Sequence, residues 1–222
     1  MWDKGWDQIF KNNEWSKYPS EELIRFIARN YYHLQNRQEI NILEIGCGTG
    51  ANIWYLASEG FTVSGIDGSS IALERAKKRL LMENLEAELV IGDVIDLPFE
   101  KNTFDCVIDN ECLYANSYED SIRIIAEVKR VIKPGGLFYS KTFMTGTYGD
   151  SNGEKLGNEK NTYNKIYKGA LRDGYGIIRF TDREEIYQLY GSFCIEVIDY
   201  VIRSDKNSSY EVKEWIIICR KR

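Results

Sequence analysis

Ile40-Asn41-Ile42-Leu43-Glu44-Ile45-Gly46-Cys47-Gly48-Thr49-Gly50 is the stretch that decides the fold. Its apolar first part predicts a buried strand. The three alternate glycines then allow a sharp turn and a close approach of a ligand to the backbone, because they carry no Cβ. Residues 51–58 are typical of the helix that follows, and a second apolar strand, residues 61–66, ends at Asp67. A glycine turn at one strand tip and an acid at the next predict a nucleotide-binding site, in which the acid accepts from ribose hydroxyls.

The chain around this stretch alternates between strand and helix patterns. We expect helices over residues 20–34, 69–82 and 117–132, and strands over residues 87–91, 104–108 and 137–143. Thr181-Asp182-Arg183-Glu184 predicts the capping box of a last helix. Residues 194–203 and 210–219 predict an antiparallel hairpin on the sheet edge. Strand–helix alternation of this kind indicates an α/β fold with a parallel sheet and helices on both faces.

Residues 144–180 interrupt the alternation with seven glycines and many polar residues. A structureless segment of this length is uncommon in a compact domain and is usually functional, so we expect a lid-like insertion. Residues 1–36 combine several aromatic residues with a helical pattern and are expected to form an N-terminal cap. The whole chain, 1–222, is expected to be one domain.

The composition limits the classes of function. A net charge of −5 without a Lys/Arg stripe disfavours nucleic acid as the main partner, because neutralised phosphates supply most of that affinity. A basic patch formed only in three dimensions stays open. Five cysteines without a C-x-x-C pair indicate a reduced compartment, and we expect a cytoplasmic location. The spacing of the five cysteines and the single histidine, His33, does not match a zinc-binding pattern, so no metal is expected. The lack of a span-length apolar stretch and of a signal-peptide pattern predicts no membrane partner.

Later segments extend the pattern of the first strand and its turn. They are residues 65–70, 92–94, 97–99, 104–107 and 130–136. Together with residues 44–50, and in this order, they resemble the class I S-adenosylmethionine (SAM)-dependent methyltransferases. The first turn has the spacing G-x-G-x-G, whereas nicotinamide dinucleotide sites have G-x-G-x-x-G. The resemblance implies a Rossmann-like three-layer sandwich. Its seven-stranded, mostly parallel sheet would have the order 3-2-1-4-5-7-6 and a reversed C-terminal strand.

The resemblance also implies a role for each motif in SAM binding. The glycine loop, with Gly46, Cys47, Gly48 and Gly50, would wrap the methionine part of SAM. Glu44 would hold the SAM ammonium directly or through water; the alternative is a satisfied buried acid that braces the loop.

The acids at the next two strand tips would bind the nucleoside. Asp67 would accept from the ribose hydroxyls, or else cap the following helix. Asp93 would accept from the adenine amino group beside the Val94 amide, or else be an ordinary turn aspartate. Gly68 and Ser69 would line the adenine side, and Asn110 would contact the methionine moiety through its backbone.

Residues 110–114 depart from one branch of the family. Asn110-Glu111-Cys112-Leu113-Tyr114 lacks the prolines of many methyltransferases that act on exocyclic base amines. Tyr114 stands where small-molecule members often carry a histidine, and it either orients a substrate or packs under the lid. His33 is expected at a helix end, and methyl transfer needs no nucleophile such as Cys112. The catalytic residues are therefore unknown.

Six further aromatic residues are candidates to line an acceptor pocket or, alternatively, to form the lid's own core: Trp6, Trp15, Tyr18, Tyr148, Tyr163 and Tyr167. We expect methyl transfer from SAM to a small or medium-sized organic acceptor by in-line displacement, with release of S-adenosylhomocysteine (SAH). A protein or RNA methyltransferase, a non-catalytic SAM-binding protein and a nicotinamide oxidoreductase are the alternatives. The chain is expected to be a monomer or a homodimer.

Overall fold

The computed structural model describes residues 3–169 and 176–222. Parts of the expected cap (residues 1–2) and of the expected lid (170–175) therefore lie outside the described residues. The helices are α1 (Gly5–Asn12), α2 (Glu21–Tyr31), α3 (Ala51–Ser58), α4 (Ser70–Met82), α5 (Tyr118–Val131) and α6 (Arg183–Tyr190), with short 3₁₀ turns η1 (Arg37–Glu39) and η2 (Leu113–Ala115). The strands are β1 (Asn41–Ile45), β2 (Thr62–Asp67), β3 (Glu88–Ile91), β4 (Phe104–Asn110), β5 (Ile132–Phe143), β6 (Gly153–Lys155), β7 (Thr162–Ile166), β8 (Ile178–Arg179), β9 (Cys194–Asp205) and β10 (Tyr210–Arg220).

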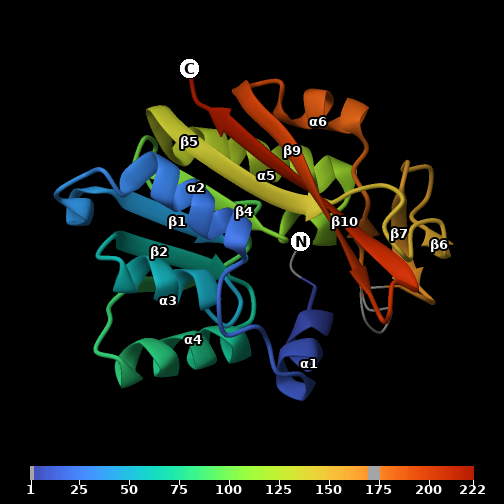
Figure 1. Cartoon of the computed structure of the whole chain (residues 1–222), viewed down its shortest axis with the longest axis horizontal. Helices are drawn as coiled ribbons and strands as arrows, with labels where there is room; N and C mark the ends of the chain where they lie inside the picture. The colour runs from blue at the N-terminus through green and yellow to red at the C-terminus, as the bar shows by residue number, and fades with distance from the viewer. Residues whose placement is uncertain (1–2, 170–175) are drawn as a thin grey trace.

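A seven-stranded sheet forms the middle layer, in the order β3-β2-β1-β4-β5-β10-β9 (Figure 1). Strands β1 to β5 pair in parallel, and β10 pairs antiparallel with both β5 and β9. Since β9 and β10 are the sixth and seventh strands of this sheet, the predicted order 3-2-1-4-5-7-6 is confirmed. Ile45 pairs with Ile66 of β2 and with Asp109 of β4. The carboxyl ends of these three strands therefore meet at one edge of the sheet.

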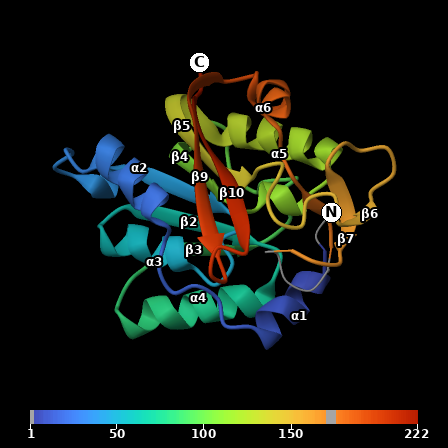
Figure 2. The same cartoon turned by 45° about the vertical axis from the view of Figure 1, so that its right-hand side comes forward.

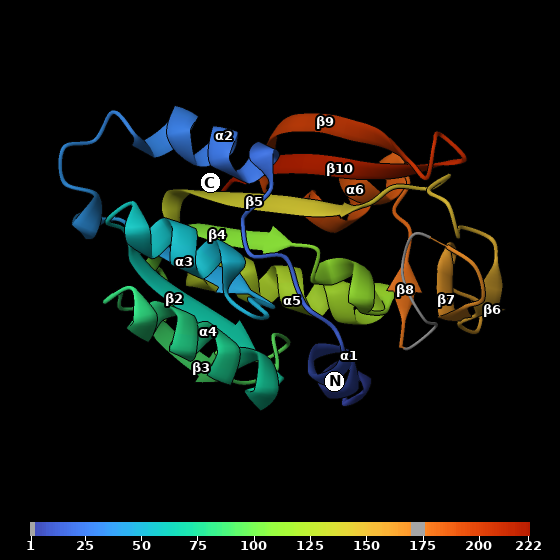
Figure 3. The ribbon, with the colours of Figure 1, turned by 60° about the horizontal axis from the view of Figure 1, so that its bottom comes forward.

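Alternation of apolar residues along β1 divides the core between two faces of the sheet. Ile42 packs with α2, α3 and α4, whereas its neighbour Leu43 packs with α5 and α6 on the opposite face. Figure 3 shows these helical layers on either side of the strands. The hairpin β9–β10 extends the sheet beyond β5, and α1 lies beside α4 (Figures 1 and 2). The three-layer α/β sandwich predicted from the sequence is thus the observed fold.

Several predicted boundaries differ from the observed ones; for example α2, predicted to reach residue 34, ends at Tyr31. The capping box of α6 is formed by Asp182 and Glu185, one residue later than predicted. Asp182 is the cap because its Oδ1 accepts from the amides of Glu184 and Glu185, each at 3.0 Å, while the Thr181 hydroxyl accepts from Arg179 Nη1 at 3.2 Å. Strand β5 begins at Ile132, five residues earlier than predicted. The turn at Gly135, with φ of +79°, stays within the strand, and a register shift against β4 accommodates it.

The described parts of the insertion, residues 144–169 and 176–180, contain strands where the sequence predicted a structureless segment. Strands β6, β7 and β8 form a small antiparallel sheet, which lies beyond the end of β10 (Figure 3). Ile166, Ile178 and Phe180 pack there against Phe143 of β5 and Val212 of β10. This insertion therefore has a small hydrophobic core that joins it to the main sheet.

Candidate active site

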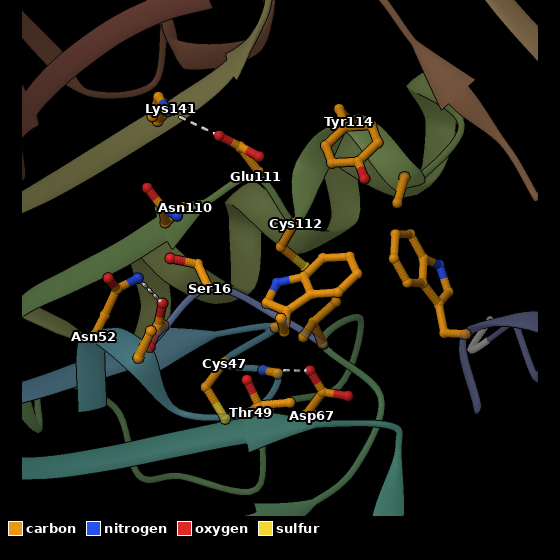
Figure 4. Close-up of a pocket in the computed structure, with 18 of the residues that line it drawn as sticks. Ser16, Cys47, Thr49, Asn52, Asp67, Asn110, Glu111, Cys112, Tyr114 and Lys141 are labelled. Atoms are coloured by element: carbon orange, nitrogen blue, oxygen red, sulfur yellow. Dashed lines mark hydrogen bonds and ion pairs between the residues drawn. The ribbon is translucent and has the colours of Figure 1, made fainter. Parts of the chain in front are cut away.

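A cavity of about 450 Å³ lies at the carboxyl ends of β1, β2 and β4. Open α/β sheets bind ligands at this edge. Its floor is the glycine loop and the strand tips, and its cover comes from α1 and residues 15–20. Figure 4 shows side chains from these distant segments directed toward one another around the cavity.

The loop after β1 requires glycine at two positions, and a side chain at each would collide with a different neighbour. Gly46 has φ of +63°, and a Cβ there would lie 2.5 Å from Cys112 Sγ. Gly50 has φ of +77° and caps α3, where a Cβ would lie 2.7 Å from Ala76 of α4. Gly46, Cys47 and Gly48 line the cavity, but Gly50 does not. Gly50 thus has a role in the close packing of α3 against α4, and its predicted contact with SAM stays a prediction.

Asp67 is buried at the tip of β2 and lines the cavity. Its Oδ2 accepts from the Gly48 amide and its Oδ1 from the Ser69 amide, each at 2.8 Å. Burial raises the pKa of Asp67, and these two amide bonds oppose that rise. The side chain thus ties the glycine loop to the start of α4. Gly68 lines the cavity, whereas Ser69 is buried beneath it, caps α4 and donates to Asp7 Oδ1 at 2.5 Å.

Glu44 has one carboxylate oxygen that lacks a protein partner. The residue is only 2% exposed. Its Oε1 accepts from Asn52 Nδ2 at 2.5 Å, while its Oε2 is buried with no hydrogen-bond partner. Burial, assisted by the Asp67 and Asp109 carboxylates, raises the pKa of Glu44 to about 8. A buried, unpartnered carboxylate oxygen in a cavity wall is suited to receive the cationic group of a ligand.

The turn after β3 and the tip of β4 complete this side of the cavity. Asp93 and Val94 both line it, and Asp93 Oδ1 also accepts from the Ile95 amide at 3.2 Å. Asn110 lines it too, and its Oδ1 is buried without a hydrogen-bond partner.

Sequence reasoning missed Asn52, whose only signal is a polar side chain in the first turn of a mainly apolar helix.

Four of the predicted aromatic residues, Trp6, Trp15, Tyr18 and Tyr114, line the cavity. The Trp6 ring centroid lies 6.3 Å from that of Trp15 and 6.4 Å from that of Tyr114, in edge-to-face contacts. Phe10, which the sequence prediction omitted, also lines the cavity and packs 5.2 Å from Trp15. This aromatic wall covers the glycine loop, since a Cβ on Gly48 would lie 3.5 Å from the Phe10 ring.

Tyr148, Tyr163 and Tyr167 do not line the cavity, which corrects the prediction for these three. Tyr148 stacks on Tyr210 at 4.4 Å. Tyr163 is buried in the core of the insertion, where its hydroxyl accepts from the Ser151 amide. Tyr167 is exposed and donates to Glu154. For Tyr163, the alternative that the insertion buries its own aromatic residues is the observed one.

A chain of charged residues lies beside the aromatic wall. Lys141 Nζ lies 2.8 Å from Glu111 Oε1 and 2.9 Å from Glu214 Oε1. Arg203 Nη1 lies 3.0 Å from Glu214 Oε2. Glu111, Lys141 and Arg203 line the cavity, and sequence reasoning missed all of them. Charged residues recur along β5 and β10, so the sequence pattern does not distinguish Lys141 or Glu214 from the other charged residues of these strands. His33, by contrast, is exposed just after α2.

A family model described as "Methyltransferase domain" matches residues 42–136, which run from β1 into β5. Residues 42–136 thus form a methyltransferase domain. Over 218 residues the chain is 29% identical to a sterol 24-C-methyltransferase of Neurospora crassa, an alignment that covers 93% of this chain and 53% of that protein. The chain spans about half the length of this curated relative.

Solved structures agree with the domain's fold. A SAM-dependent methyltransferase of Methanosarcina mazei superposes with a TM-score of 0.72 at 22% identity, over 92% of this chain and 98% of that one. A 1,6-didemethyltoxoflavin-N1-methyltransferase of Burkholderia thailandensis, solved with SAH bound, superposes with a TM-score of 0.62 at 17% identity, over 87% of this chain and 75% of that one. At these identities the likeness establishes the fold alone.

Two features are absent from the described residues, 3–169 and 176–222. No group of three or more His, Cys, Asp or Glu side chains there is arranged to hold a metal ion. None of the helices in these ranges is long and apolar enough to cross a membrane.

Proposed function

We propose that the methyltransferase domain transfers a methyl group from SAM to a small or medium-sized organic acceptor and releases SAH. The observation that carries this proposal is the buried, unpartnered Oε2 of Glu44 in a cavity that also contains the glycine loop and Asp67. SAM has a group for each of these features: an ammonium, a carboxylate and a ribose diol.

Each part of the donor side has a defined task in this proposal. Glu44 would receive the ammonium, and the amides of the glycine loop at the start of α3 would face the carboxylate. Asp67, held by two backbone amides, would keep its remaining lone pairs for the ribose hydroxyls. Asp93 and the Val94 amide would meet the adenine, as the sequence predicts.

SAM, when bound, supplies a methyl carbon that is already activated by its positive sulfur. The protein then has to align the acceptor and exclude water, which accounts for much of the acceleration in such reactions. Helix α1 contributes to both because Trp6 and Phe10 close the cavity above the glycine loop. Aromatic faces also favour a nearby cation.

The size of the cavity favours a small acceptor over a macromolecule. Small-molecule sites generally occupy about 300–1,000 Å³, and this cavity, at about 450 Å³, is covered by α1 and residues 15–20. The activities of the similar proteins, 24-C-methylation of sterols and N1-methylation of 1,6-didemethyltoxoflavin, also support an organic acceptor. The five cysteines are free thiols, which supports the predicted cytoplasmic location.

Binding of SAH and of NADH, measured by isothermal titration calorimetry, tests the proposal first. We expect SAH to bind wild type, and Asp67→Ala to weaken it by about 100-fold or more, as for the loss of a buried charged partner. Asp199→Ala, an exposed acid on β9, is the control and should bind SAH as wild type does. Binding of NADH instead of SAH would refute the proposal.

Transfer itself is tested with isotope-labelled SAM and a panel of small amines, alcohols, thiols and acids, read by mass spectrometry. We expect label in at least one acceptor and none with Asp67→Ala. Tight SAH binding without any labelled acceptor would favour the non-catalytic SAM-binding protein.

A further inference from the structure

Four charged residues, one just after β4 and the others on β5, β10 and β9, form a continuous chain at the acceptor side of the cavity. The order is Glu111, Lys141, Glu214 and Arg203, with successive N–O distances of 2.8, 2.9 and 3.0 Å. Lys141 is 5% exposed and Glu214 is 1% exposed at the side chain. Buried charges persist only when they are paired, so these two residues depend on each other.

Glu111 is the member of this chain that the cavity reaches. Its side chain is 31% exposed and lines the cavity. In Figure 4 one carboxylate oxygen is joined to Lys141, and the other points away from Lys141 toward the side of Cys112 and Tyr114. The second oxygen is therefore presented to a ligand while the first is anchored.

The backbone holds Glu111 in a conformation that side chains seldom adopt. Its φ is +66°, and its amide donates to the Lys141 carbonyl at 2.9 Å. A left-handed conformation at a non-glycine residue costs about 1–2 kcal/mol and clusters at functional sites. Lys141 thus fixes Glu111 twice, through its carbonyl and through its ammonium.

Glu111 is also the ionised member of the carboxylate pair. The Lys141 ammonium and hydrogen bonds to the carboxylate outweigh burial and hold the pKa of Glu111 below its usual value. Burial, with the neighbouring Glu111 carboxylate, raises the pKa of Glu214 to about 7. Of the two carboxyls, Glu214 therefore takes up a proton more readily, and the negative charge stays on Glu111, which faces the cavity.

The surroundings favour a cation over an anion at this point. Among the described residues, 3–169 and 176–222, the cavity is lined by two cationic side chains, Lys141 and Arg203, and both are already paired with carboxylates. Trp6 and Tyr114 contribute aromatic rings to the same wall, and such rings attract cations. An acceptor carboxylate would therefore face the Glu111 carboxylate, whereas a cation would be attracted to it.

We propose that Glu111 recognises a positively charged amino group on the methyl acceptor, with Lys141 and Glu214 as the residues that position it. This inference rests on the proposed function and names the class of acceptor for the same cavity. It names the group through which the acceptor is bound and does not specify which atom of the acceptor is methylated.

Two probes of similar shape and opposite charge test this inference: phenethylamine and 3-phenylpropanoate, titrated into the full-length protein saturated with SAH. We expect phenethylamine to bind at least about tenfold more tightly than 3-phenylpropanoate, as for a hydrogen bond to a charged group. Glu111→Gln should remove this preference while SAH affinity stays within about twofold. Glu111→Asp, which keeps the charge, should retain part of it.

Glu196→Gln is the matched control, since Glu196 is 35% exposed and paired with Arg220, outside the residues that line the cavity. This variant should keep the preference for the amine. Equal affinities for the two probes, tighter binding of the carboxylate, or no measurable binding of the amine would overturn the inference. So would a Glu111→Gln variant that binds SAM less tightly and leaves amine binding unchanged, since Glu111 would then serve the sulfonium. Failure of SAH to bind wild type would instead refute the proposed function.

Discussion

The two halves of the cavity are built in different ways. The donor half takes its parts from the tips of β1, β2 and β3, within about fifty consecutive residues. Much of it is backbone, namely glycines in the left-handed conformation and amides such as that of Gly48, and a side chain at these glycines would strain the chain or collide with a neighbour. The acceptor half takes its parts from α1, the β4 tip, β5 and β9. It consists of side chains that meet only when the whole chain has folded.

This difference separates the tasks of the two halves. A site made of short-range backbone geometry tolerates little change, because each glycine occupies a position where a Cβ would collide or strain the chain. A site made of side chains on a fixed scaffold can change its residues one at a time and thereby its ligand. The comparison therefore predicts that damage to the acceptor half spares SAH binding, whereas damage to the glycine loop does not.

The largest expected effect is that of Lys141→Met. Removing the ammonium leaves Glu111 and Glu214 without their shared partner in a buried setting, and we expect the free energy of unfolding to fall by about 4 kcal/mol. Urea denaturation measures this change. In the fraction that stays folded, SAH affinity should remain within about threefold of wild type.

Lys133→Met is the matched control for that variant. Lys133 pairs with Asp105 at 2.8 Å, but both side chains are substantially exposed, and exposed pairs contribute less than about 1 kcal/mol. Equal losses of stability for the two variants would contradict the view that the acceptor half depends on a buried charge chain. Loss of SAH binding in folded Lys141→Met would break the separation of the two halves.

Gly46→Ala should produce the next largest effect, on the donor half. The new Cβ would lie 2.5 Å from Cys112 Sγ at a φ of +63°, so strain and collision add. We expect a loss of about 3 kcal/mol in the free energy of unfolding and at least a 100-fold loss of SAH affinity, about 2.7 kcal/mol. Thermal unfolding and calorimetry measure the two quantities.

Gly60→Ala separates strain from collision. Gly60 has φ of +85°, and nothing lies within 4 Å of its added Cβ. Only the backbone strain applies, so this variant should lose about 1 kcal/mol and bind SAH normally. If Gly46→Ala behaved like Gly60→Ala, the loop would have more freedom than its packing against Cys112 implies.

The contrast between the halves also explains which features the sequence alone could predict. The bounds of β1, β2 and α3 follow from local patterns, because strand, glycine turn and helix are adjacent in the chain. Asp67 was found for the same reason, since it ends a strand. The order of the sheet and the candidate Asp93 came from the family resemblance. The roles of Asp67 and Asp93 toward SAM stay predictions.

The acceptor half could not be predicted in this way. Glu111, Lys141 and Glu214 are distant in the chain and are brought together only by the pairing of β4, β5 and β10. Strands β6 to β8 are short and polar, so their pattern resembles that of a loop, and tertiary packing decides them. Tyr163 resembled a pocket residue because an aromatic residue in the insertion's core has the same sequence signal as one in a cavity wall.

Proton release from Glu44 should give a smaller effect, a pH dependence of SAH affinity, which tests whether Glu44 pairs with the ligand ammonium in the donor half. The pKa of Glu44 is raised to about 8 in the free protein, so its carboxyl is mostly protonated at pH 7. A ligand ammonium stabilises the ionised form, so binding releases a proton and SAH affinity should rise with pH. The rise approaches about tenfold per pH unit below pH 8 and levels off above it.

Calorimetry from pH 6 to 8.5 in buffers of different ionisation enthalpy measures both the affinity and the released proton. Glu44→Gln cannot release this proton, so its SAH affinity should be nearly independent of pH over the same range. A wild-type affinity that is flat between pH 6 and 8, or a pH dependence that survives in Glu44→Gln, would contradict a direct pairing of Glu44 with the ammonium.

The smallest effect is expected from Tyr167→Phe, which tests whether the insertion belongs to the acceptor half of the cavity. Tyr167 is exposed, and its hydroxyl donates to Glu154 within the small β6–β7 sheet. We expect the unfolding free energy to change by less than about 0.5 kcal/mol. Phenethylamine binding should change by less than about twofold, since no atom of the cavity wall is altered.

Trp6→Ala is the counterpart of this variant on the cavity wall. Trp6 packs against both Trp15 and Tyr114, so its loss opens the cover above the acceptor side and should weaken the amine at least about fivefold, given typical cation–π and packing contributions. A Tyr167→Phe variant that weakened the amine as much as Trp6→Ala does would mean that the insertion closes onto the acceptor. The boundary of the acceptor half would then extend from α1 and β4 to residues 144–169.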